Sequence, residues 1–262
     1  MDHEAVLSLF DRQMRQGARA DDPGARVEQI GDVVRQIGAG NDDWNGVVWS
    51  DLDEVTADAA ITAQVQYFAS LGREFEWKLY GHDEPSDLAG RLRTAGFSPE
   101  PEETLMVAEI DDLSIGVELP EGVHLQSVTG PSGVDLAVDV HEQAFGTSAV
   151  RLRHRMLSQL VGRPETLSMV VAMAGELPVC AARMELHPGT AFAGLWGGGT
   201  VPAWRGRGIY RALVAHRARI AAELGYRYLQ VDASSQSRPI LQRLGFAVLS
   251  TTTPHVYRPE SL

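Results

Sequence analysis

Two stretches of the chain repeat one order of elements, and this repeat constrains the fold more than any other feature. Residues 71–97 and 224–246 both run from a Leu-Gly pair at the end of a predicted helix, through a predicted strand, into a helix that ends in Gly-Phe. A long helical pattern precedes each stretch, and an apolar strand pattern follows it. The alternative is a chance similarity between two common patterns. We interpret the repeat as one fold used twice, with the first copy shortened.

Strand and helix patterns alternate along the whole chain, which indicates an α/β or α+β class. The predicted strands are residues 26–38, 45–52, 74–81, 103–110, 124–128, 166–175, 177–187, 191–201, 226–233 and 247–259, and the predicted helices are residues 2–18, 54–72, 85–97, 133–146, 148–162, 205–225 and 234–246. These elements predict two tandem mixed-sheet units with flanking helices. We expect the units at residues 1–115 and 120–262, joined by a connection at 111–123.

Composition narrows the class of protein. An apolar fraction of 44% predicts a packed core, and the single cysteine, Cys180, excludes an intrachain disulfide. A net charge of −12 argues against a general binder of nucleic acid or anionic membranes, which needs a basic face. The sequence contains no run of 18 apolar residues, so it predicts no membrane span. We therefore expect a soluble cytoplasmic protein that can form a homodimer and has no nucleic-acid or membrane partner.

The stretch WRGRGIYRALVAHR, residues 204–217, reverses the charge of its surroundings. Between Val201 and Gln230 there are six arginines and one acid. The N-terminus of a helix exposes unpartnered N–H groups and carries about half a positive charge, and glycines let an anion approach that backbone closely. The turn therefore predicts a polyanionic ligand. A solvated arginine-rich helix face is the alternative, but it leaves Gly206 and Gly208 unexplained.

The identity of the anion follows from a resemblance. The phosphate-loop pattern ending in G-K-[ST] and the G-x-G-x-x-G dinucleotide pattern are both absent. The stretch TVPAWRGRGIY, followed by a long helix, the strand YLQVDA and a helix ending in LGF, resembles the GNAT superfamily of acyl-CoA-dependent acyltransferases. Its pyrophosphate loop, [QR]-x-x-G-x-[GA], is matched by residues 205–209, whereas Tyr210 departs from the small final residue. The resemblance implies acetyl-CoA as the cofactor, and Thr200 and Val201 correspond by position to the strand that lines the pantetheine arm.

The cofactor-binding residues that this resemblance implies lie in two neighbouring stretches, residues 199–201 and 205–210. They are Gly199, Thr200, Val201, Arg205, Gly206, Arg207, Gly208, Ile209 and Tyr210. The implied reaction is direct transfer of an acetyl group from acetyl-CoA to an amine, either on a small molecule or at a peptide N-terminus. No cluster of His, Cys and acidic residues has the spacing of metal ligands, so we expect no metal.

The reaction requires a donor for the carbonyl oxygen, a base for the amine proton and an acid for the thiolate. Three consecutive glycines, residues 197–199, suggest a bulge or a close backbone approach where the donor is expected; a merely flexible strand end is the alternative. Glu185 and His187 share one face of a predicted strand and are candidate bases. His141 and Glu142 are alternatives, at the end of a helix that usually contacts the acceptor in this fold.

The expected acid is missing. Leu241 occupies the position where many members of the superfamily have a tyrosine, and Ser234 that of a frequent asparagine. Tyr257 and Tyr210 are candidate acids, and water is the third candidate, because a CoA thiolate is a good leaving group. The competing hypothesis for the whole chain is a catalytically inactive acyl-CoA-binding module or sensor.

Two further expectations concern packing. The first copy has nothing like R-G-x-G before its long helix, so we expect it to hold no pyrophosphate and to play a structural part. In the second copy, an apolar stripe should pack the long helix on the sheet, with His216 and Cys180 buried; the stripe comprises Ile209, Leu213, His216, Ile220 and Leu224.

Overall fold

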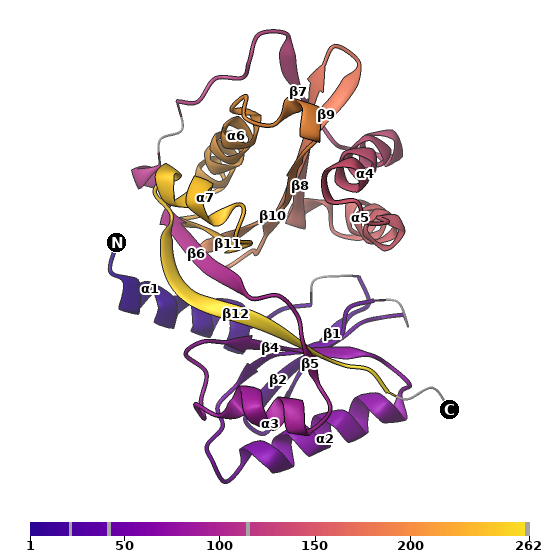
Figure 1. Ribbon diagram of the computed structural model, residues 1–262, viewed down its shortest axis with the longest axis vertical. Helices are drawn as coiled ribbons and strands as arrows, with labels where there is room; N and C mark the ends of the chain where they lie inside the picture. Colours follow the sequence, from indigo (N-terminus) through magenta and orange to yellow (C-terminus); the bar gives the residue numbers. More distant parts are fainter. Residues whose placement is uncertain (21–22, 41–42, 114–115, 260–262) are drawn as a thin grey trace. The chain divides into compact units, whose positions relative to one another are not determined.

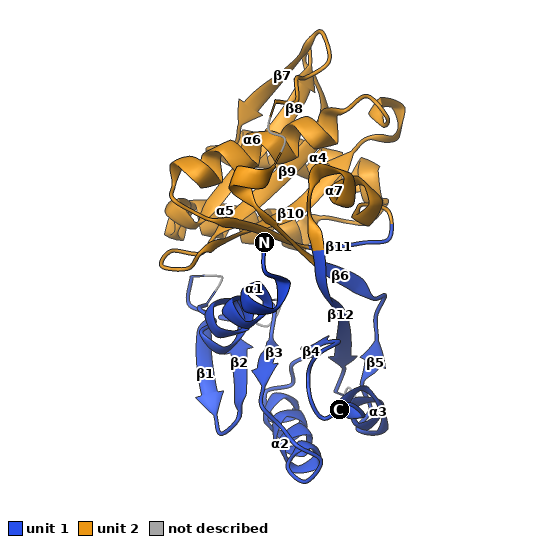
Figure 2. Cartoon of the chain, turned by 90° about the vertical axis from the view of Figure 1, so that its left-hand side faces the viewer, with its two compact units in different colours: residues 1–105, 232–235, 248–262 blue, residues 106–231, 236–247 orange. Residues whose placement is uncertain are grey.

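The chain forms two compact units, and each is discontinuous in sequence (Figures 1 and 2). The computed structural model describes residues 1–20, 23–40, 43–113 and 116–259. Unit 1 comprises Met1–Leu105, Asp232–Ser235 and Val248–Leu262, and unit 2 comprises Met106–Val231 and Gln236–Ala247. The last strand of the chain therefore counts with the first unit, whereas the sequence analysis groups it with residues 120–262. Residues 114 and 115 of the predicted connection lie outside the described residues.

Unit 1 is a mixed sheet with helices packed against it. Its elements are α1 (His3–Phe10), a π-helical turn (Asp11–Gln16), β1 (Arg26–Ile30), β2 (Val33–Ile37), β3 (Gly46–Ser50), α2 (Ala57–Ser70), β4 (Phe75–Tyr80), α3 (Leu88–Thr94), β5 (Ser98–Pro99), the start of β6 (Glu103–Glu109) and most of β12 (Ala247–Tyr257). The strand order is β1-β2-β3-β4-β12-β6, and β5 pairs with β12. Strands β1, β2 and β3 are antiparallel, and β3 pairs with β4 in parallel.

Unit 2 is also a mixed sheet with flanking helices. Its elements are the end of β6, β7 (Val123–Ser127), α4 (Pro131–Phe145), α5 (Val150–Gly162), β8 (Leu167–Ala174), β9 (Leu177–Leu186), β10 (Phe192–Thr200), α6 (Ile209–Glu223), most of β11 (Tyr228–Ala233) and α7 (Arg238–Leu244). The strand order is β6-β11-β10-β9-β8-β7. Helices α4 and α5 cover one face of this sheet and α6 covers the other (Figure 1).

The two units repeat one succession of elements, as the sequence predicts. Three antiparallel strands, a helix, a parallel strand and a second helix appear as β1-β2-β3-α2-β4-α3 in unit 1. The same succession appears as β8-β9-β10-α6-β11-α7 in unit 2. The predicted fold class, two tandem mixed-sheet units with flanking helices, is confirmed.

Each unit has its own apolar core. In unit 1 the ring of Phe75 stacks on that of Phe68 from α2 and meets that of Phe97 edge to face, and Phe75 and Phe97 also contact the ring of Tyr257. In unit 2 the core joins α4 and α6 to strands β8 and β9, and Cys180 is fully buried in it, as expected. Burial of this apolar surface is the main force that holds each sheet to its helices.

Several local expectations are wrong. Residues 26–38 form two strands with a turn at Gly31, whose φ of +57° suits glycine. The stripe predicted for α6 ends early, because Leu224 is 57% exposed and His216 is only half-buried. Arg217, which is not part of the predicted apolar stripe, is only 1% exposed.

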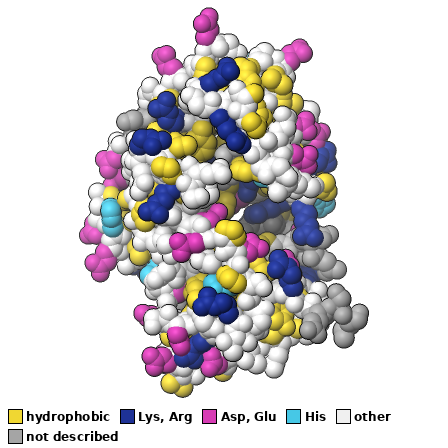
Figure 3. Space-filling model, viewed as in Figure 1, with side chains coloured by type: hydrophobic (Ala, Val, Ile, Leu, Met, Phe, Trp, Pro, Cys, Tyr) yellow, Lys and Arg dark blue, Asp and Glu magenta, His cyan; other side chains and the backbone are white. Residues whose placement is uncertain are grey.

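Two observations concern the surface. Within the described ranges, no helix combines the length and apolar character that crossing a bilayer requires. On the face shown in Figure 3, lysine and arginine side chains are spread out and separated by hydrophobic and uncharged ones.

Candidate functional site

The turn before α6 presents an open helix N-terminus. The chain leaves β10 at Thr200, makes a 3₁₀ turn at Pro202–Trp204, and enters α6 after Gly208. Gly206 and Gly208 have φ values of +76° and +84°, in the left-handed region that favours glycine. Gly208 is the N-cap and supplies no side chain to cap the helix. Within the described part of the chain, the N–H groups of Gly206 and Gly208 donate to no backbone carbonyl, so they are available to an anion.

Two arginines of this turn keep their full charge beside it. Arg205 donates through Nε to the carbonyl oxygen of Thr200 at 3.1 Å and through Nη2 to that of Ala144 at 2.9 Å. Arg207 lies over the ring of Trp204, 4.4 Å from its centroid, and donates to the carbonyl of Ala203 at 3.3 Å. Carbonyl oxygens fix both guanidinium groups without neutralising them. The turn is therefore a cationic site with free backbone donors.

The corresponding turn of unit 1 is closed. Its counterpart helix α2 is preceded by Asp53, whose Oδ1 accepts from the N–H of Val55 at 2.9 Å and from the N–H and hydroxyl of Thr56 at 2.8 Å each. These hydrogen bonds lower the pKa of Asp53 and hold its negative charge where an incoming phosphate would need positive potential. That the first copy holds no pyrophosphate stays a prediction, and the charge of Asp53 at this turn is the physical reason for it.

The three glycines of β10 form a bulge. The register between β9 and β10 shifts between Trp196 and Gly199, and Gly197 has a φ of +57°. A Cβ on Gly198 would stand 2.7 Å from the ring of Tyr210, and one on Gly199 would stand 2.8 Å from the ring of Phe145. The predicted bulge and close approach are confirmed. Because these glycines have no side chain, a residue of α6 packs closely against one face of the strand and a residue of α4 packs closely against the other.

Beside this bulge β10 loses its parallel partner. The register between β10 and β11 covers only Phe192–Gly194 against Tyr228–Gln230, although β10 continues to Thr200. The bulged half of β10 therefore has no β11 ladder, and its backbone groups on that side are left for another partner.

Glu185 lies between two guanidinium groups on the face covered by α4 and α5. Its carboxylate is 3.5 Å from Nη2 of Arg155 on α5 and 3.6 Å from Nε of Arg183 on β9. Burial alone would raise the pKa of Glu185, but the charges of Arg155 and Arg183 outweigh it and lower the pKa. A carboxylate held in this way is a weak base.

His187 differs from Glu185 although the structure brings them together. It follows β9 directly, and its buried Nε2 has no hydrogen-bond partner among the described residues. Burial lowers the pKa of His187, although the charge of Glu185 opposes this effect. A Cβ built on Gly194 would stand 3.4 Å from this Nε2 and 2.8 Å from both Nε2 of Gln230 and Nε1 of Trp196. The absence of a side chain at Gly194 thus leaves three nitrogen atoms around one point on the sheet, and the lowered pKa of His187 favours its neutral form there.

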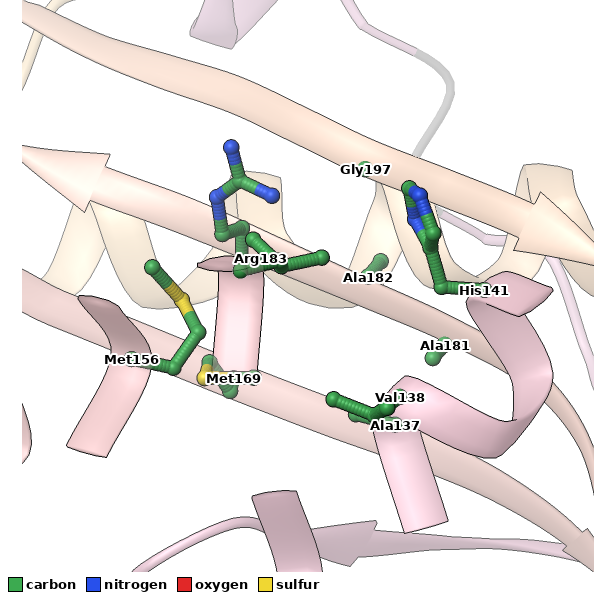
Figure 4. A pocket seen from close by; sticks show the side chains of 10 residues that line it. Ala137, Val138, His141, Met156, Met169, Ala181, Ala182, Arg183 and Gly197 are labelled. Carbon is green, nitrogen blue, oxygen red and sulfur yellow. The ribbon is translucent and has the colours of Figure 1, made fainter. Parts of the chain in front are cut away.

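A small pocket is lined by residues of α4, α5, β8, β9 and β10 (Figure 4). Arg183 and His141 stand at its two ends, with apolar side chains below and between them. Its lining comprises Ala137, Val138, His141, Leu152, Met156, Met169, Ala181, Ala182, Arg183 and Gly197. Burial lowers the pKa of His141, and the charge of Arg183 acts in the same direction. Glu142, the neighbouring candidate base, instead caps α5 by accepting from the N–H of Ala149 at 2.9 Å.

The remaining predicted residues fall into two groups. Thr200, Val201 and Ile209 belong to the β10–α6 connection, where Thr200 Oγ1 lies 3.1 Å from Sγ of Cys180, and Val201 and Ile209 are buried. Tyr257 is not brought to this site: it lies on β12 in unit 1, and its ring packs on Phe75 and Phe97. The sequence could not show this, because it does not reveal which sheet β12 joins.

Sequence analysis missed Arg155, Arg183 and Gln230 as site residues. Arg183 and Glu185 alternate with apolar residues in the strand VCAARMEL, a pattern that places both charges on one face. That signal was available for Arg183. Arg155 and Gln230 come from other elements and offered no such pattern.

Comparisons with known proteins identify the fold. A GCN5-related N-acetyltransferase from Kribbella flavida is 19% identical, with a TM-score of 0.69 over 99% of this chain and 95% of that chain. A tandem GNAT protein from the clavulanic acid biosynthesis pathway is 13% identical, with a TM-score of 0.64 over 99% and 95%. A conserved protein of unknown function from Staphylococcus epidermidis is 12% identical, with a TM-score of 0.70 over 93% and 97%. No family model and no curated protein matches the sequence. The chain therefore has the GNAT fold.

Proposed function

We propose that this GNAT-fold chain binds acetyl-CoA at the N-terminus of α6 and transfers its acetyl group to an amine. The observation that carries the proposal is the open turn before α6, with Gly206, Gly208 and two arginines that form no ion pair with any carboxylate of the described residues. A diphosphate is an anion that such a turn suits, because the backbone N–H groups of Gly206 and Gly208 and the charges of two arginines belong to one short turn.

The residues fit acetyl-CoA on both sides of the turn. A Cβ built on Gly206 meets no atom within 4 Å, so the space over this backbone is open. The part of β10 without a β11 ladder leads from the bulge to the turn and offers backbone partners for the amides of a pantetheine arm. When bound, acetyl-CoA supplies an activated acyl carbon and a thiolate leaving group.

Two features of the chain suit the acceptor chemistry. We propose Nε2 of His187, which has no hydrogen-bond partner among the described residues, as the base that takes the proton an amine nitrogen loses as it forms its bond to carbon; the lowered pKa favours the neutral imidazole that this role requires. Glu185 is a poorer candidate, because two guanidinium groups already hold its charge. The N–H groups along the bulge at residues 197–199 are the donors for the oxygen that becomes negative.

The acid for the thiolate has no obvious candidate. Leu241 is fully buried and carries no proton to give. Tyr210 packs under Gly198, and burial raises the pKa of its phenol, which makes it a weaker acid. We infer that water protonates the thiolate. The missing acid also keeps the inactive acyl-CoA sensor as the second candidate function.

The test pairs two glycines that have similar φ values. Gly206 and Gly225 have φ values of +76° and +81°, and a Cβ on either meets nothing within 4 Å. Gly206→Val and Gly225→Val therefore carry a similar strain, but only the first blocks the turn. Calorimetry should show CoA binding lost in Gly206→Val and kept in Gly225→Val; equal affinities would overturn the assignment. Thiol release from acetyl-CoA that rises with an amine panel would separate the transferase from the sensor.

A further inference from the structure

Three polar side chains of unit 1, from distant parts of the sequence, form one connected line. Nδ1 of His82 lies 2.8 Å from Oγ of Ser250, and Nε2 of His82 lies 2.9 Å from Oδ2 of Asp11. Asp11 begins the π-helical turn after α1, His82 lies in the turn after β4, and Ser250 lies on β12. A hydroxyl, an imidazole and a carboxylate in contact in this order are the parts of an activated nucleophile.

The carboxylate of Asp11 decides which nitrogen of the imidazole carries the proton. Burial alone would raise the pKa of Asp11, but its hydrogen bond with His82 and the charge of Arg15 outweigh burial and lower the pKa. Asp11 is therefore ionised at neutral pH and only accepts hydrogen bonds, so Nε2 of His82 is the donor. Nδ1 keeps its lone pair and faces the hydroxyl of Ser250. In this tautomer the imidazole is able to take the proton of the hydroxyl.

A buried arginine holds the carboxylate in place. Arg15 is 3% exposed, and it donates through Nη1 to Oδ1 of Asp11 at 2.8 Å and through Nη2 to both oxygens of Asp83 at 2.7 Å each. Its Nη1 also lies 3.3 Å from Nε2 of His82, and its guanidinium lies 4.0 Å from the centroid of the Tyr80 ring. Because two carboxylates pair with this one guanidinium, an imidazolium that forms beside Asp11 still has a negative partner.

A glycine leaves space beside the hydroxyl of Ser250. Gly81 is exposed, and its N–H donates to the carbonyl oxygen of Thr251 at 3.0 Å. A Cβ built on Gly81 would stand 3.6 Å from Oγ of Ser250, 2.6 Å from Oγ1 of Thr251 and 3.6 Å from the backbone nitrogen of Thr251. No side chain fills this point, so it is open to a carbonyl group. Ser250 would be its nucleophile, and the hydroxyl of Thr251 would be the donor for its oxygen.

We propose that Ser250 is a nucleophile that takes an acyl group from a small activated ester. Its Oγ forms a bond to the carbonyl carbon, and its proton passes to Nδ1 of His82. The bond between that carbon and the leaving oxygen then breaks, and the proton on His82 passes to the leaving oxygen or to water. The products are an acyl-serine and an alcohol or phenol. This activity goes beyond the proposed acetyl transfer to an amine, and none of its residues belongs to the turn before α6.

The experiment treats the full chain with 4-nitrophenyl acetate and follows the release of 4-nitrophenolate. A burst near one equivalent per chain should appear, and peptide mass spectrometry should locate the acetyl group on Ser250. The background is low, because Lys78 is the only lysine in the sequence. The absence of an adduct, or an acetyl group on Lys78 or another residue but not on Ser250, would overturn the proposal.

Three variants test the parts of the connected line. Ser250→Ala should remove the adduct, whereas Ser98→Ala, at an exposed position on β5, should keep it. His82→Gln should slow acylation about 10²–10⁴-fold, which is the usual contribution of a general base. Asp11→Asn should slow it by roughly tenfold or more, because an amide no longer fixes the tautomer. A rate that is equal in the parent chain and in His82→Gln would contradict the assignment of the base.

A second pair of variants leaves all three side chains in place. Gly81→Ala puts a methyl group where the carbonyl is expected, so it should slow acylation by about tenfold or more. Gly90→Ala on α3, where a Cβ meets no atom within 4 Å, should not change the rate. Circular dichroism checks that each variant is folded. If the connected line only ties the π-helical turn to the sheet, no acyl-serine forms in the parent chain, and the proposal fails.

Discussion

Nη1 of Arg217 donates a hydrogen bond of 2.9 Å to the carbonyl oxygen of Arg183, opposite the start of the bulge in β10. Arg217 reaches this oxygen from α6, and its Nε donates to the carbonyl of Leu213 at 3.1 Å. Burial lowers the pKa of Arg217, but a guanidinium stays charged in proteins. A buried cation thus lies next to the bulged strand and anchors the strand that carries Arg183.

This relationship predicts a stability effect. Arg217→Leu leaves the carbonyl of Arg183 without its donor, and an unsatisfied buried polar group costs about 1–3 kcal/mol. Urea unfolding should show a loss of that size. Arg219→Leu, on the exposed side of the same helix, should stay within about 0.5 kcal/mol of the parent. A more stable Arg217→Leu variant would mean that desolvation of the guanidinium outweighs its hydrogen bonds.

The contrast between the two turns predicts one acetyl-CoA site per chain. Asp53 occupies the N–H groups before α2 and adds a negative charge, whereas the turn before α6 is open. Calorimetric titration with CoA should therefore give a stoichiometry near one. Asp53→Ala should leave that number unchanged, because the turn of unit 1 also lacks the arginines. Two sites per chain would show that unit 1 binds the cofactor by another route.

The state of His187 predicts the pH dependence of turnover. Its pKa is lowered from the usual value of about 6.5, so the imidazole is neutral at pH 7 and gains a proton only as the pH falls below that value. Turnover at saturating acetyl-CoA should fall on the acid side with a midpoint below 6.5. His187→Gln should lower turnover about 10²–10⁴-fold and remove this limb. Glu185→Gln should retain the limb, and its disappearance there would assign the base to Glu185 instead.

Removal of either tyrosine hydroxyl should have a small effect. Tyr210→Phe keeps the ring that packs under Gly198, and Tyr257→Phe keeps the ring that packs on Phe75 and Phe97. If water protonates the thiolate, each variant should lose less than roughly tenfold in turnover, compared with about 10²–10⁴-fold for a lost general acid. A hundredfold loss with unchanged acetyl-CoA affinity would identify the tyrosine as the acid.

Local features of this fold were readable from the sequence. The order of helices and strands, the glycine turn before α6 and the bulge of β10 depend on neighbouring residues, and the repeat was visible as two similar stretches. The partner of a strand depends on distant chain segments, so the place of β12 and of Tyr257 was not readable. The group formed by Arg155, Arg183 and Glu185 could not be predicted for the same reason, because its members come from two different elements, α5 and β9.

The place of β12 has a consequence for how the chain reaches its native state. Val248–Leu262 belong to unit 1, where β12 pairs with β4 from Phe75 to Tyr80. These partners are about 175 residues apart in sequence, and closing so long a loop is slow. During synthesis unit 1 cannot complete its sheet until Ala247–Tyr257 have been made, so the unit whose strands begin to form before those of unit 2 is completed after them. Until then β4 has an unpaired edge, and a strand open to misassembly lies in the unit whose turn before its long helix is occupied by Asp53.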